Sequence, residues 1–234
     1  GCDGLHGPCR DAIPEEAGQV FEKIFPFGWL GVTSETAPIV EELLYAASPR
    51  GFALCSMKDA RQGRYYLQVP LSDSPEDWED DRIWEELRRR LPRDAAEKLP
   101  GGALSGKYIA PLRSSVMQPM QFGKMALCGD AAHTVPPTGA KGLNTAAGDV
   151  HYLYHALTRH FREADEAALS AYSQHALARI WKTQRFSWWM TNLMHRFPDQ
   201  TAFDVEMQAA DLAYLASSET AQRSLAENYV GLPY

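Results

Sequence analysis

The chain has 234 residues, of which 45% are hydrophobic and 11% aromatic, so it is long enough to bury one large core or two modest ones. Its formal net charge of -7 at pH 7 leaves no excess of lysine and arginine to neutralise phosphates, which argues against nucleic acid or an anionic membrane as a partner. No apolar run in the sequence is long enough to span a bilayer.

The four cysteines, at positions 2, 9, 55 and 128, neither form C-x-x-C pairs nor reach the density of a disulfide scaffold. Such usage favours a reducing compartment, and no signal peptide is evident, so we expect a cytoplasmic protein. The arginine run at residues 88–90 follows an acidic stretch, and we interpret it as the end of a helix rather than as a basic patch.

Residues 1–23 predict the tail of a strand, a loop and a short helix. From residue 24 to about residue 110 the pattern changes to short runs of apolar and aromatic residues, with turn signals between the last three runs. The runs lie at residues 29–33, 42–47, 51–56 and 64–70. This pattern predicts a mostly antiparallel sheet.

A helix is predicted to accompany this sheet. Ser74 supplies a hydroxyl cap, Pro75 stands at the first helical position, and acidic residues follow in the first turn. Apolar residues that include Trp84 and Leu87 fall on one face, and Pro92 stops the helix.

Residues 127–144, LCGDAAHTVPPTGAKGLN, are the most informative stretch of the chain. An apolar run at residues 124–128 predicts a buried strand, and Gly129 and Asp130 end it, so that backbone can come close to a ligand. A helical pattern begins at Leu143, and the free N–H groups and dipole of a helix start favour an anion or a group that becomes anionic. The alternative is a strand-to-helix connection without a ligand, because short glycine motifs match many unrelated proteins.

A long helical pattern follows at residues 165–194 and ends in an aromatic cluster, Phe186, Trp188 and Trp189. An apolar surface of this kind belongs either to a core or to an oligomer interface. Two shorter helices are predicted to begin near residues 204 and 219.

Ser56, Lys58 and Tyr66 are the most informative polar residues of the predicted sheet. They lie on two neighbouring strands, and residues of like parity on paired strands can point to one face. A hydroxyl, an ammonium and a phenol around one pocket would suit a small carboxylate. Alternatively, the three are scattered surface and edge residues.

Two histidine arrangements raise the question of a metal. His151 and His155 are one helical turn apart, but tyrosine follows the first of them instead of the glutamate of H-E-x-x-H. Asp130 and His133 have no evident third ligand nearby. We therefore predict no metal site and favour packing or cofactor roles for these residues.

Several segments together resemble the single-component flavoprotein aromatic hydroxylases. The GDAAH sequence, the two prolines and GAKGLN closely resemble the second FAD motif of that family, and residues 1–4 resemble its Asp-Gly motif. Other segments resemble family members in the same order along the chain: residues 26–29, 109–113, 186–189 and 227–234. The resemblance covers essentially the whole chain. Family members begin with a G-x-G-x-x-G segment that is absent here, so we expect a C-terminal part of a longer enzyme, inactive by itself.

The resemblance implies that the complete enzyme binds FAD and takes hydride from NADPH. Implied FAD contacts are Asp3, Arg64, Gly129, Asp130, Lys141, Gly142, Leu143 and Asn144. Arg64 would control the position of the mobile flavin ring. Implied NADPH contacts are His6, Arg10 and Arg113, of which the first two would otherwise be ordinary solvated loop residues.

The resemblance also implies how an aromatic acid is bound, with Ser56, Lys58 and Tyr66 at the positions that hold its carboxylate. Lys58 stands where arginine is expected. A guanidinium grips a carboxylate with two parallel hydrogen bonds, whereas an ammonium acts as a strongly hydrated point charge. We therefore expect a weaker hold on the acid, or a shifted substrate or coenzyme preference.

The resemblance further implies that three residues surround the reacting ring, Tyr45, Tyr229 and Pro137. Tyr45 would hydrogen-bond the substrate phenol, Tyr229 would stand behind it in a proton relay, and Pro137 would line the pocket. A phenolate is a far better nucleophile than a phenol, and a stepwise proton path ionises it without exposing the reaction to bulk water.

The expected fold is α/β (α+β). Residues 1–23 would belong to an FAD/NAD(P)-binding domain, residues 24–109 to a substrate-binding domain built on an antiparallel sheet, and residues 110–234 to the continuation of the FAD-binding domain with C-terminal helices. The implied reaction inserts one atom of O2 ortho to the hydroxyl of 4-hydroxybenzoate, by way of a flavin C4a-hydroperoxide, and gives 3,4-dihydroxybenzoate; the implied assembly is a homodimer. The alternatives are a hydroxylase of another hydroxylated or amino-substituted aromatic acid, and a non-catalytic chain that binds aromatic acids or partner chains without flavin.

Overall fold

The computed structural model describes residues 1–231 and divides into two compact units. Unit 1 comprises Gly1–Ile24, Arg113–Thr191 and the described part of Tyr214–Tyr234, and unit 2 comprises Phe25–Leu112 and Asn192–Ala213. Among residues 1–231, no helix combines the length and the apolar character that a membrane span needs. Residues 232–234, which end the last segment that carries the family resemblance, lie outside the described residues.

An antiparallel sheet forms the framework of unit 2, which confirms the strand pattern predicted from the apolar runs. Its strands are β1 (Gln19–Ser34), β2 (Leu44–Ala46), β3 (Ala53–Asp59), β4 (Gln62–Pro70) and β5 (Leu104–Gln118), in the order β2-β3-β4-β1-β5. β1 and β5 begin in one unit and end in the other. Along β4, half-buried and buried residues alternate, as expected for a strand with one face on a core.

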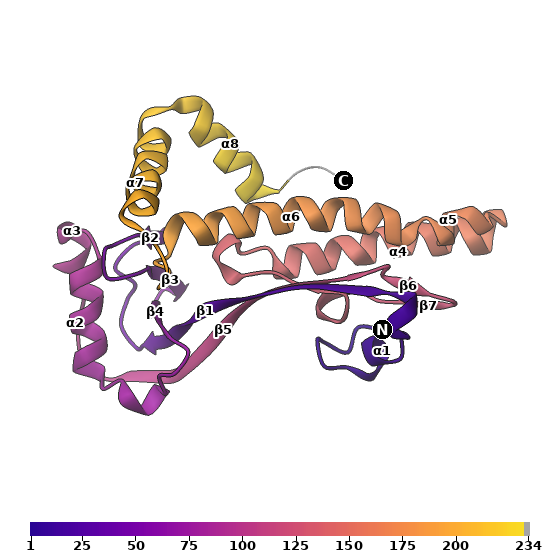
Figure 1. Ribbon diagram of the computed structural model, residues 1–234. Helices are drawn as coiled ribbons and strands as arrows, with labels where there is room; N and C mark the ends of the chain where they lie inside the picture. Colours follow the sequence, from indigo (N-terminus) through magenta and orange to yellow (C-terminus); the bar gives the residue numbers. More distant parts are fainter. Residues whose placement is uncertain (232–234) are drawn as a thin grey trace. The chain divides into compact units, whose positions relative to one another are not determined.

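The buried face of this sheet packs against helix α2 (Asp80–Arg90), which lies beside β3 and β4 (Figure 1). Tyr65 and Leu67 of β4 and Trp84 and Leu87 of α2 are each at most 1% exposed. At roughly 1.5 to 3 kcal/mol for each large buried apolar side chain, this layer holds unit 2 together.

The start of α2 was predicted too early. Ser74 and Asp77 do form a capping box, but it belongs to the short 3-10 turn Pro75–Asp77, and the chain begins α2 afresh after Glu79. A capping box satisfies the first turn of a short helix as well as that of a long one, so the sequence signal alone does not tell the two apart. Helix α3 (Arg93–Ala96) follows α2.

β5 is a strand that the sequence did not predict. Gly106 and Pro111 interrupt its pattern, and proline inside a strand normally argues against one. The strand survives because β8 (His133–Thr134) pairs only with Ser115 and Val116, which leaves the segment around Pro111 unpaired on that side.

Unit 1 is dominated by two long helices, α4 (Gly142–Glu163) and α6 (Tyr172–Met194), which run side by side in Figure 1. The helix predicted from Leu143 is therefore confirmed as α4. The long helical pattern at residues 165–194 divides into α5 (Glu166–Ser170) and α6, with Ala171 between them. The two shorter helices predicted near residues 204 and 219 are α7 (Ala202–Ser217) and α8 (Glu219–Val230).

The apolar run before Gly129 forms a shorter strand than predicted. β7 (Met125–Ala126) pairs with β6 (Gln121–Phe122), and the neighbouring Leu127 is fully buried. Gly1 lies alongside this run: its ammonium group donates to the carbonyl of Ala126 at 2.6 Å, and its carbonyl accepts the N–H of Cys128 at 2.8 Å. The start of the chain is thus fastened next to the FAD-motif segment. Helix α1 (Pro8–Asp11) and the 3-10 turn Glu15–Ala17 follow.

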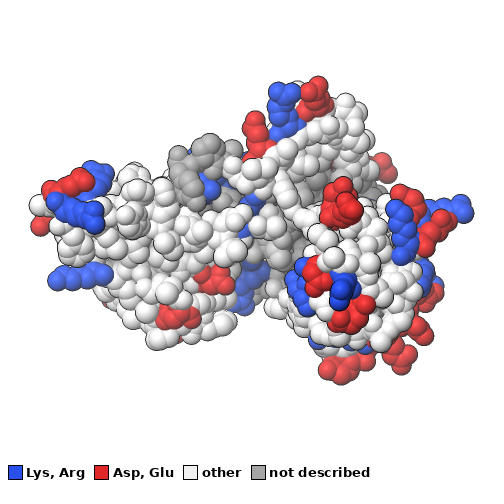
Figure 2. Space-filling view, turned by 180° about the vertical axis from the view of Figure 1, so that it is seen from behind, with Lys and Arg blue, Asp and Glu red and all other residues white. Residues whose placement is uncertain are grey.

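Charged side chains are unevenly distributed. In Figure 2 they gather over the part that carries α2 and α3, while much of the visible face of the part that carries α4 to α6 is uncharged except at its α5 end. Helix α4 itself exposes large apolar side chains, among them Leu143, Val150 and Phe161.

Candidate functional site

Residues of the FAD motif border an open cavity in unit 1, which we call the glycine-turn cavity. Its volume is about 550 Å³. The residues that define it are Cys2, Gly4, Gly129, Asp130, Gly142 and Leu143. The start of the chain, the turn after β7 and the start of α4 therefore meet there, although they are far apart in sequence.

Gly129 is the residue that the backbone geometry of this cavity requires. Its φ of 61° lies in the left-handed region that favours glycine, and it begins the 3-10 turn Gly129–Ala131. A Cβ at this position would also approach the Cβ of Ala146 to 3.4 Å. The turn is therefore both bent and closely packed against α4.

A buried carboxylate of α4 holds this turn. Asp149 accepts the N–H of Gly129 at 2.7 Å, and the same carboxylate oxygen lies 2.7 Å from Nε2 of His133. Both side chains are 2% exposed. Because a buried carboxylate requires hydrogen-bond donors, these contacts fix the turn to the helix.

Nothing in the sequence singled out Asp149, since a single acidic residue inside a helical pattern is normally solvated. His133, which was weighed as a metal ligand together with Asp130, has Asp149 as its partner. His151 and His155 make a ring contact with centroids 4.5 Å apart. Within residues 1–231, no group of three or more His, Cys, Asp or Glu side chains is placed to hold a metal ion.

The start of α4 presents backbone donors at the glycine-turn cavity. No side chain caps this helix, so N–H groups of its first turn have no partner from a capping residue. Gly142 and Leu143 line the cavity, and Leu143 is 83% exposed. A Cβ added to Gly4 would meet nothing within 4 Å, which shows that the space beside the chain start is open.

These features fit the flavin half of FAD. The flavin ring is flat and has carbonyl oxygens, which can accept hydrogen bonds from the N–H groups at a helix start. The hydroxylated ribityl chain suits a glycine turn beside an exposed carboxylate. No lysine or arginine lines the cavity, so it does not suit the pyrophosphate half equally well.

Pro137 lies on the exposed side of a 3-10 turn, Pro137–Gly139, that precedes α4. Helix α6 holds this turn in place, because the buried Thr138 hydroxyl accepts a hydrogen bond from the Thr191 hydroxyl of α6 at 3.0 Å. A Cβ at Gly139 would come within 2.6 Å of the Ser187 hydroxyl, so glycine permits the close approach to α6.

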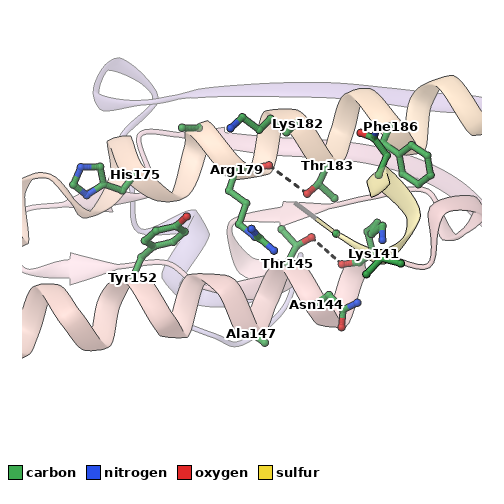
Figure 3. Close-up of a pocket in the computed structure, with 14 residues that line it drawn as sticks. Lys141, Asn144, Thr145, Ala147, Tyr152, His175, Arg179, Lys182, Thr183 and Phe186 are labelled. Carbon is green, nitrogen blue, oxygen red and sulfur yellow. Dashed lines mark hydrogen bonds between the residues drawn. The ribbon is translucent and has the colours of Figure 1, made fainter. Parts of the chain in front are cut away.

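Lys141 and Asn144, although implied to contact FAD, border a different cavity (Figure 3). The ammonium group of Lys141 donates to the carbonyl of Tyr229 and lies 5.2 Å from the centroid of its ring. Burial and the nearby charge of Arg179 lower the pKa of Lys141. Tyr229, the predicted member of a proton relay, is thus tied to Lys141.

The residues implied to bind NADPH are partly brought together in unit 1. Arg10 donates to the hydroxyl of Ser115 at 2.9 Å, and Arg113 lies 3.6 Å from the carboxylate of Glu22. Ser115 follows Arg113 by two residues on β5, and burial lowers the pKa of Arg10. His6 is exposed.

Asp3 orders the segment that carries His6. Its carboxylate accepts the N–H of Cys9 at 2.9 Å, and this hydrogen bond is the main reason why the pKa of Asp3 is lowered. Gly4, which follows it, has a φ of 86°. The Asp-Gly pair therefore forms the turn that its sequence predicts.

In unit 2, Ser56, Arg64 and Tyr66 share one face of the sheet with Tyr45. The register pairs Tyr45 with Leu54, Leu54 with Tyr66, and Ser56 with Arg64. Directly paired residues point to the same face, so the parity argument holds for Ser56 and Tyr66.

The same argument fails for Lys58. The register shifts between Met57 and Asp59, which makes Lys58 the extra residue of a β-bulge. A bulge breaks the two-residue alternation, so parity no longer puts Lys58 on the face of Ser56. The sequence offered no sign of this bulge.

An aromatic group surrounds the tyrosines on this face. The ring centroid of Tyr66 lies 5.3 Å from that of Trp29, and that of Tyr45 lies 5.8 Å from that of Phe52. Trp29 donates its ring N–H to Nε2 of the fully buried His195 at 2.7 Å. Apart from the likeness of residues 26–29 to the family, the sequence did not single out Trp29 or His195.

Tyr108 is a further polar neighbour that the sequence did not indicate. Its hydroxyl lies 3.5 Å from that of Tyr66, and Gly31 makes room for its ring, because a Cβ there would come within 2.6 Å of it. Burial and the hydrogen bond with Tyr66 raise the pKa of Tyr108 to about 12. The Tyr108 hydroxyl therefore stays protonated at neutral pH and can donate a hydrogen bond.

A family described as an FAD binding domain matches residues 1–187 of the chain. The chain belongs to this FAD-binding family. The p-hydroxybenzoate hydroxylase of Acinetobacter baylyi (strain ATCC 33305 / BD413 / ADP1) is similar over the entire chain, with 53% identity across 234 residues. The chain spans 58% of the length of that relative.

Solved structures show the same fold. The p-nitrophenol 4-monooxygenase PnpA from Pseudomonas putida DLL-E4 matches all of this chain and 59% of its own chain, with a TM-score of 0.75 and 16% identity. The Diels-Alderase PyrE3 of pyrroindomycin biosynthesis matches all of this chain and 49% of its own, with a TM-score of 0.74 and 22% identity. Membership of the FAD-binding family confirms the predicted combination of an FAD-binding fold with an antiparallel sheet and C-terminal helices.

Proposed function

We propose that this chain is part of a flavin-dependent monooxygenase that uses FAD, NADPH and O2 to convert 4-hydroxybenzoate into 3,4-dihydroxybenzoate. The observation that carries the proposal is the glycine-turn cavity, where a left-handed glycine, an exposed carboxylate and an uncapped helix start converge. The similarity to a p-hydroxybenzoate hydroxylase supports the choice of substrate.

The flavin would be held mostly by backbone. Gly129 and Asp130 would contact its ribityl chain, and the N–H groups of Leu143 and Asn144 would face its pyrimidine edge. The helix dipole would stabilise negative charge at that edge by about 0.3 to 1 kcal/mol. FAD, when bound, supplies hydride acceptance from NADPH and the activation of O2.

The other assignments to the cofactors rest on the family resemblance. Lys141 would add positive charge near the flavin, Arg64 would control the flavin position, and the Asp3 turn would contact FAD. The NADPH contacts would be His6, Arg10 and Arg113, and Arg10 donates to Ser115, two residues after Arg113 on β5.

Residues of the unit 2 face would bind the aromatic acid. Ser56 and Tyr66 would donate hydrogen bonds to its carboxylate, and Lys58 would supply a positive charge from the bulge. Tyr45 would hydrogen-bond the phenol and Tyr229 would relay its proton, while Pro137 would line the pocket. An ionised phenol is the better nucleophile, so the role of this pair is to remove one proton at the correct stage.

The replacement Tyr45→Phe in the full-length protein tests the proposal. We expect FAD binding and substrate-stimulated NADPH oxidation to persist, while the ratio of hydroxylated product to NADPH consumed falls by at least about tenfold, in line with the usual contribution of a proton-transfer group. Product is measured by chromatography and hydrogen peroxide by a coupled assay.

Tyr154→Phe is the matched control, because Tyr154 is 60% exposed on α4. Its product yield should equal that of the unchanged protein. Unchanged coupling in Tyr45→Phe would refute the relay, and a purified full-length protein without flavin absorbance would refute the hydroxylase proposal altogether. Tighter coupling with another aromatic acid would move the proposed substrate to that acid.

Lys58→Arg tests the carboxylate site. A guanidinium can add a second charge-assisted hydrogen bond, so we expect 4-hydroxybenzoate to bind more tightly by on the order of 1 to 2 kcal/mol. Substrate affinity is measured by titrating the flavin absorbance. The control Lys124→Arg makes the same change at an exposed position of unit 1 and should leave the affinity unchanged. Equal affinities in all three proteins would argue against the role of Lys58.

We further propose the domain division at residues 24 and 110, a homodimeric assembly and a cytoplasmic location. The aromatic residues Trp188 and Trp189 near the end of α6 are the candidates for a dimer contact, since Trp188 is 52% exposed. Size-exclusion chromatography with light scattering of the full-length protein tests the assembly.

A further inference from the structure

Tyr108 lies beside Tyr66 on the sheet of unit 2, although the two residues belong to strands that are not neighbours. The strand order places β1 between β4, which carries Tyr66, and β5, which carries Tyr108. Gly31 of β1 pairs directly with Tyr66, and a Cβ at Gly31 would come within 2.6 Å of the ring carbon that bears the Tyr108 hydroxyl. The Tyr108 ring therefore lies over Gly31, and its hydroxyl reaches across β1 to within 3.5 Å of the Tyr66 hydroxyl.

The absence of a side chain at Gly31 is what makes this arrangement possible. The φ of Gly31 is not positive, so its backbone conformation would accept any residue, and the demand for glycine is one of space. A glycine inside a strand commonly marks the close approach of another group. Any larger residue at this position would push the Tyr108 ring away from Tyr66.

Tyr66 is also in contact with a fixed aromatic neighbour. Its ring centroid lies 5.3 Å from that of Trp29, and Trp29 donates its ring N–H to Nε2 of His195, which is fully buried. Packing of this kind restricts the rotamers of a side chain before any ligand arrives. The Tyr66 hydroxyl therefore loses little conformational entropy when it binds one.

The distance between the two hydroxyls favours an acceptor atom between them. A strong O–H···O hydrogen bond has an oxygen–oxygen distance of about 2.7 Å, so the 3.5 Å separation of Tyr66 and Tyr108 allows only a weak bond from one to the other. An oxygen atom of a ligand can lie at about 2.7 Å from both hydroxyls at once. Both phenols can donate, and an anionic oxygen is the acceptor that gains most from two donors.

Lys58 is a less fixed donor than this pair. It is the extra residue of the bulge between Met57 and Asp59, and it is exposed. An exposed ammonium group is strongly hydrated and sits on a flexible stem. The two phenols are therefore better placed than Lys58 to fix the direction in which a carboxylate is held.

We infer that Tyr108 is a further substrate-binding residue, which donates together with Tyr66 to the carboxylate of the aromatic acid. The inference rests on the proposed function, because that function assigns the acid to the face of Ser56 and Tyr66. Tyr108 would act as a determinant of specificity. Two donors that converge on one oxygen reject an analogue without an acceptor there, since its binding would leave both hydroxyls without that partner.

Tyr108→Phe tests the inference, because it keeps the ring and removes only the hydroxyl. Binding of 4-hydroxybenzoate and of 4-methylphenol to the full-length protein is measured by isothermal titration calorimetry at neutral pH. We expect Tyr108→Phe to weaken the binding of 4-hydroxybenzoate by about tenfold, the usual effect of one charge-assisted hydrogen bond. The affinity for 4-methylphenol, which carries a methyl group in place of the carboxylate, should stay the same.

Tyr65→Phe is the matched control, since it makes the same change next to Tyr66 but on the opposite, buried face of β4. It should bind both ligands as the unchanged protein does. Gly31→Ala keeps the Tyr108 hydroxyl but displaces its ring, so it should weaken 4-hydroxybenzoate binding as Tyr108→Phe does. Circular dichroism and the unfolding temperature without ligand establish that each variant is folded, and Tyr108→Phe carries the comparison should Gly31→Ala fail to fold.

Two further variants, Ser56→Ala and Tyr66→Phe, separate a failure of this inference from a failure of the proposed function. If they weaken 4-hydroxybenzoate binding and Tyr108→Phe does not, the carboxylate site stands and the role of Tyr108 is refuted. Equal weakening of both ligands by Tyr108→Phe would also overturn the inference, because it would reveal a packing role. If none of these variants changes the affinity, or the unchanged protein does not bind 4-hydroxybenzoate, the proposed carboxylate site fails and this inference fails with it.

Discussion

The two cavities of unit 1 share helix α4 and differ in almost every other respect. Among residues 1–231, the glycine-turn cavity is lined by backbone, one exposed carboxylate and no lysine or arginine. The second cavity, which we call the cationic cavity, has Lys141, Arg179 and Lys182 in its lining. The same helix start contributes Gly142 and Leu143 to one cavity and Lys141 and Asn144 to the other.

This difference shows two ways of preparing a site for a ligand. Backbone N–H groups and a helix dipole are fixed by the fold and suit a largely neutral ring that gains charge only during chemistry. Charged side chains suit a ligand that is already an anion, but their mutual repulsion must be tolerated when the ligand is absent. The comparison therefore predicts that the glycine-turn cavity is sensitive to changes in packing and the cationic cavity to changes in charge.

The largest effect is expected from Asp149→Ala. It removes the carboxylate that accepts the Gly129 N–H and contacts His133, each at 2.7 Å. Because the Asp149 and His133 side chains are both buried, the free energy of unfolding should fall by about 3 kcal/mol. Urea unfolding of the full-length protein measures the loss, and FAD affinity should fall with it.

Asp130→Asn is the control for that change, because Asp130 is an exposed carboxylate of the same turn. Its stability should stay within about 0.5 kcal/mol of the unchanged protein. If Asp149→Ala proved equally harmless, the glycine-turn cavity would not depend on the packing of α4, and that half of the comparison would fail.

An intermediate effect is expected from Gly129→Ala. The left-handed φ of 61° should cost about 1 kcal/mol of stability for a residue with a Cβ, and the Cβ would sit 3.4 Å from Ala146. Gly123→Ala is matched to it, since Gly123 has a φ of 56° but nothing within 4 Å of the added Cβ. Differential scanning calorimetry should show similar losses in both variants.

Flavin titration then separates these two glycine variants. Only Gly129→Ala should weaken FAD binding, because only Gly129 lines the glycine-turn cavity. Equal flavin affinity in the two proteins would show that the turn serves the fold alone.

The outline of the fold was predictable because its elements carry strong local signals. The strand predicted at residues 51–56 overlaps β3, and the one predicted at residues 64–70 lies within β4. The helix expected at Leu143 begins one residue earlier as α4. β5 was not predicted, because a proline fits inside a strand only where no neighbouring strand pairs with it on that side. Whether a neighbour is present is a property of the whole sheet and cannot be read from the segment.

The site was predictable where a motif or a parity rule applied. Gly129 and Asp130 of the GDAAH sequence, with Gly142 and Leu143, led to the glycine-turn cavity. Alternation led correctly to the shared face of Ser56 and Tyr66. The role of Asp149 could not be predicted, since its partner Gly129 is distant in sequence. The bulge at Lys58 could not be predicted either, since it depends on the register between two paired strands. The cationic cavity was also missed, because its charges come from the start of α4 and from α6, and no single segment encodes how these two helices pack.

The smallest effect is expected from the titration of Lys141. Burial, followed by the charge of Arg179, holds its pKa below its ordinary value of 10.5, so the unfolded chain binds this proton more readily than the folded one. Between the two pKa values stability therefore rises with pH on account of the buried Lys141, by on the order of 1 kcal/mol. Because burial raises the pKa of Tyr65 and Cys55 to about 12 each, which acts in the opposite direction, the useful quantity is the difference between the unchanged protein and Lys141→Met.

That difference, measured by urea unfolding from pH 8 upward, should shift in favour of the unchanged protein as pH rises. The second replacement Arg179→Gln should reduce the trend, because it removes the positive charge that, together with burial, lowers the pKa of Lys141. A trend that persists unchanged in Arg179→Gln would mean that burial alone depresses the pKa of Lys141. The two cavities would then differ in composition but not in their response to charge.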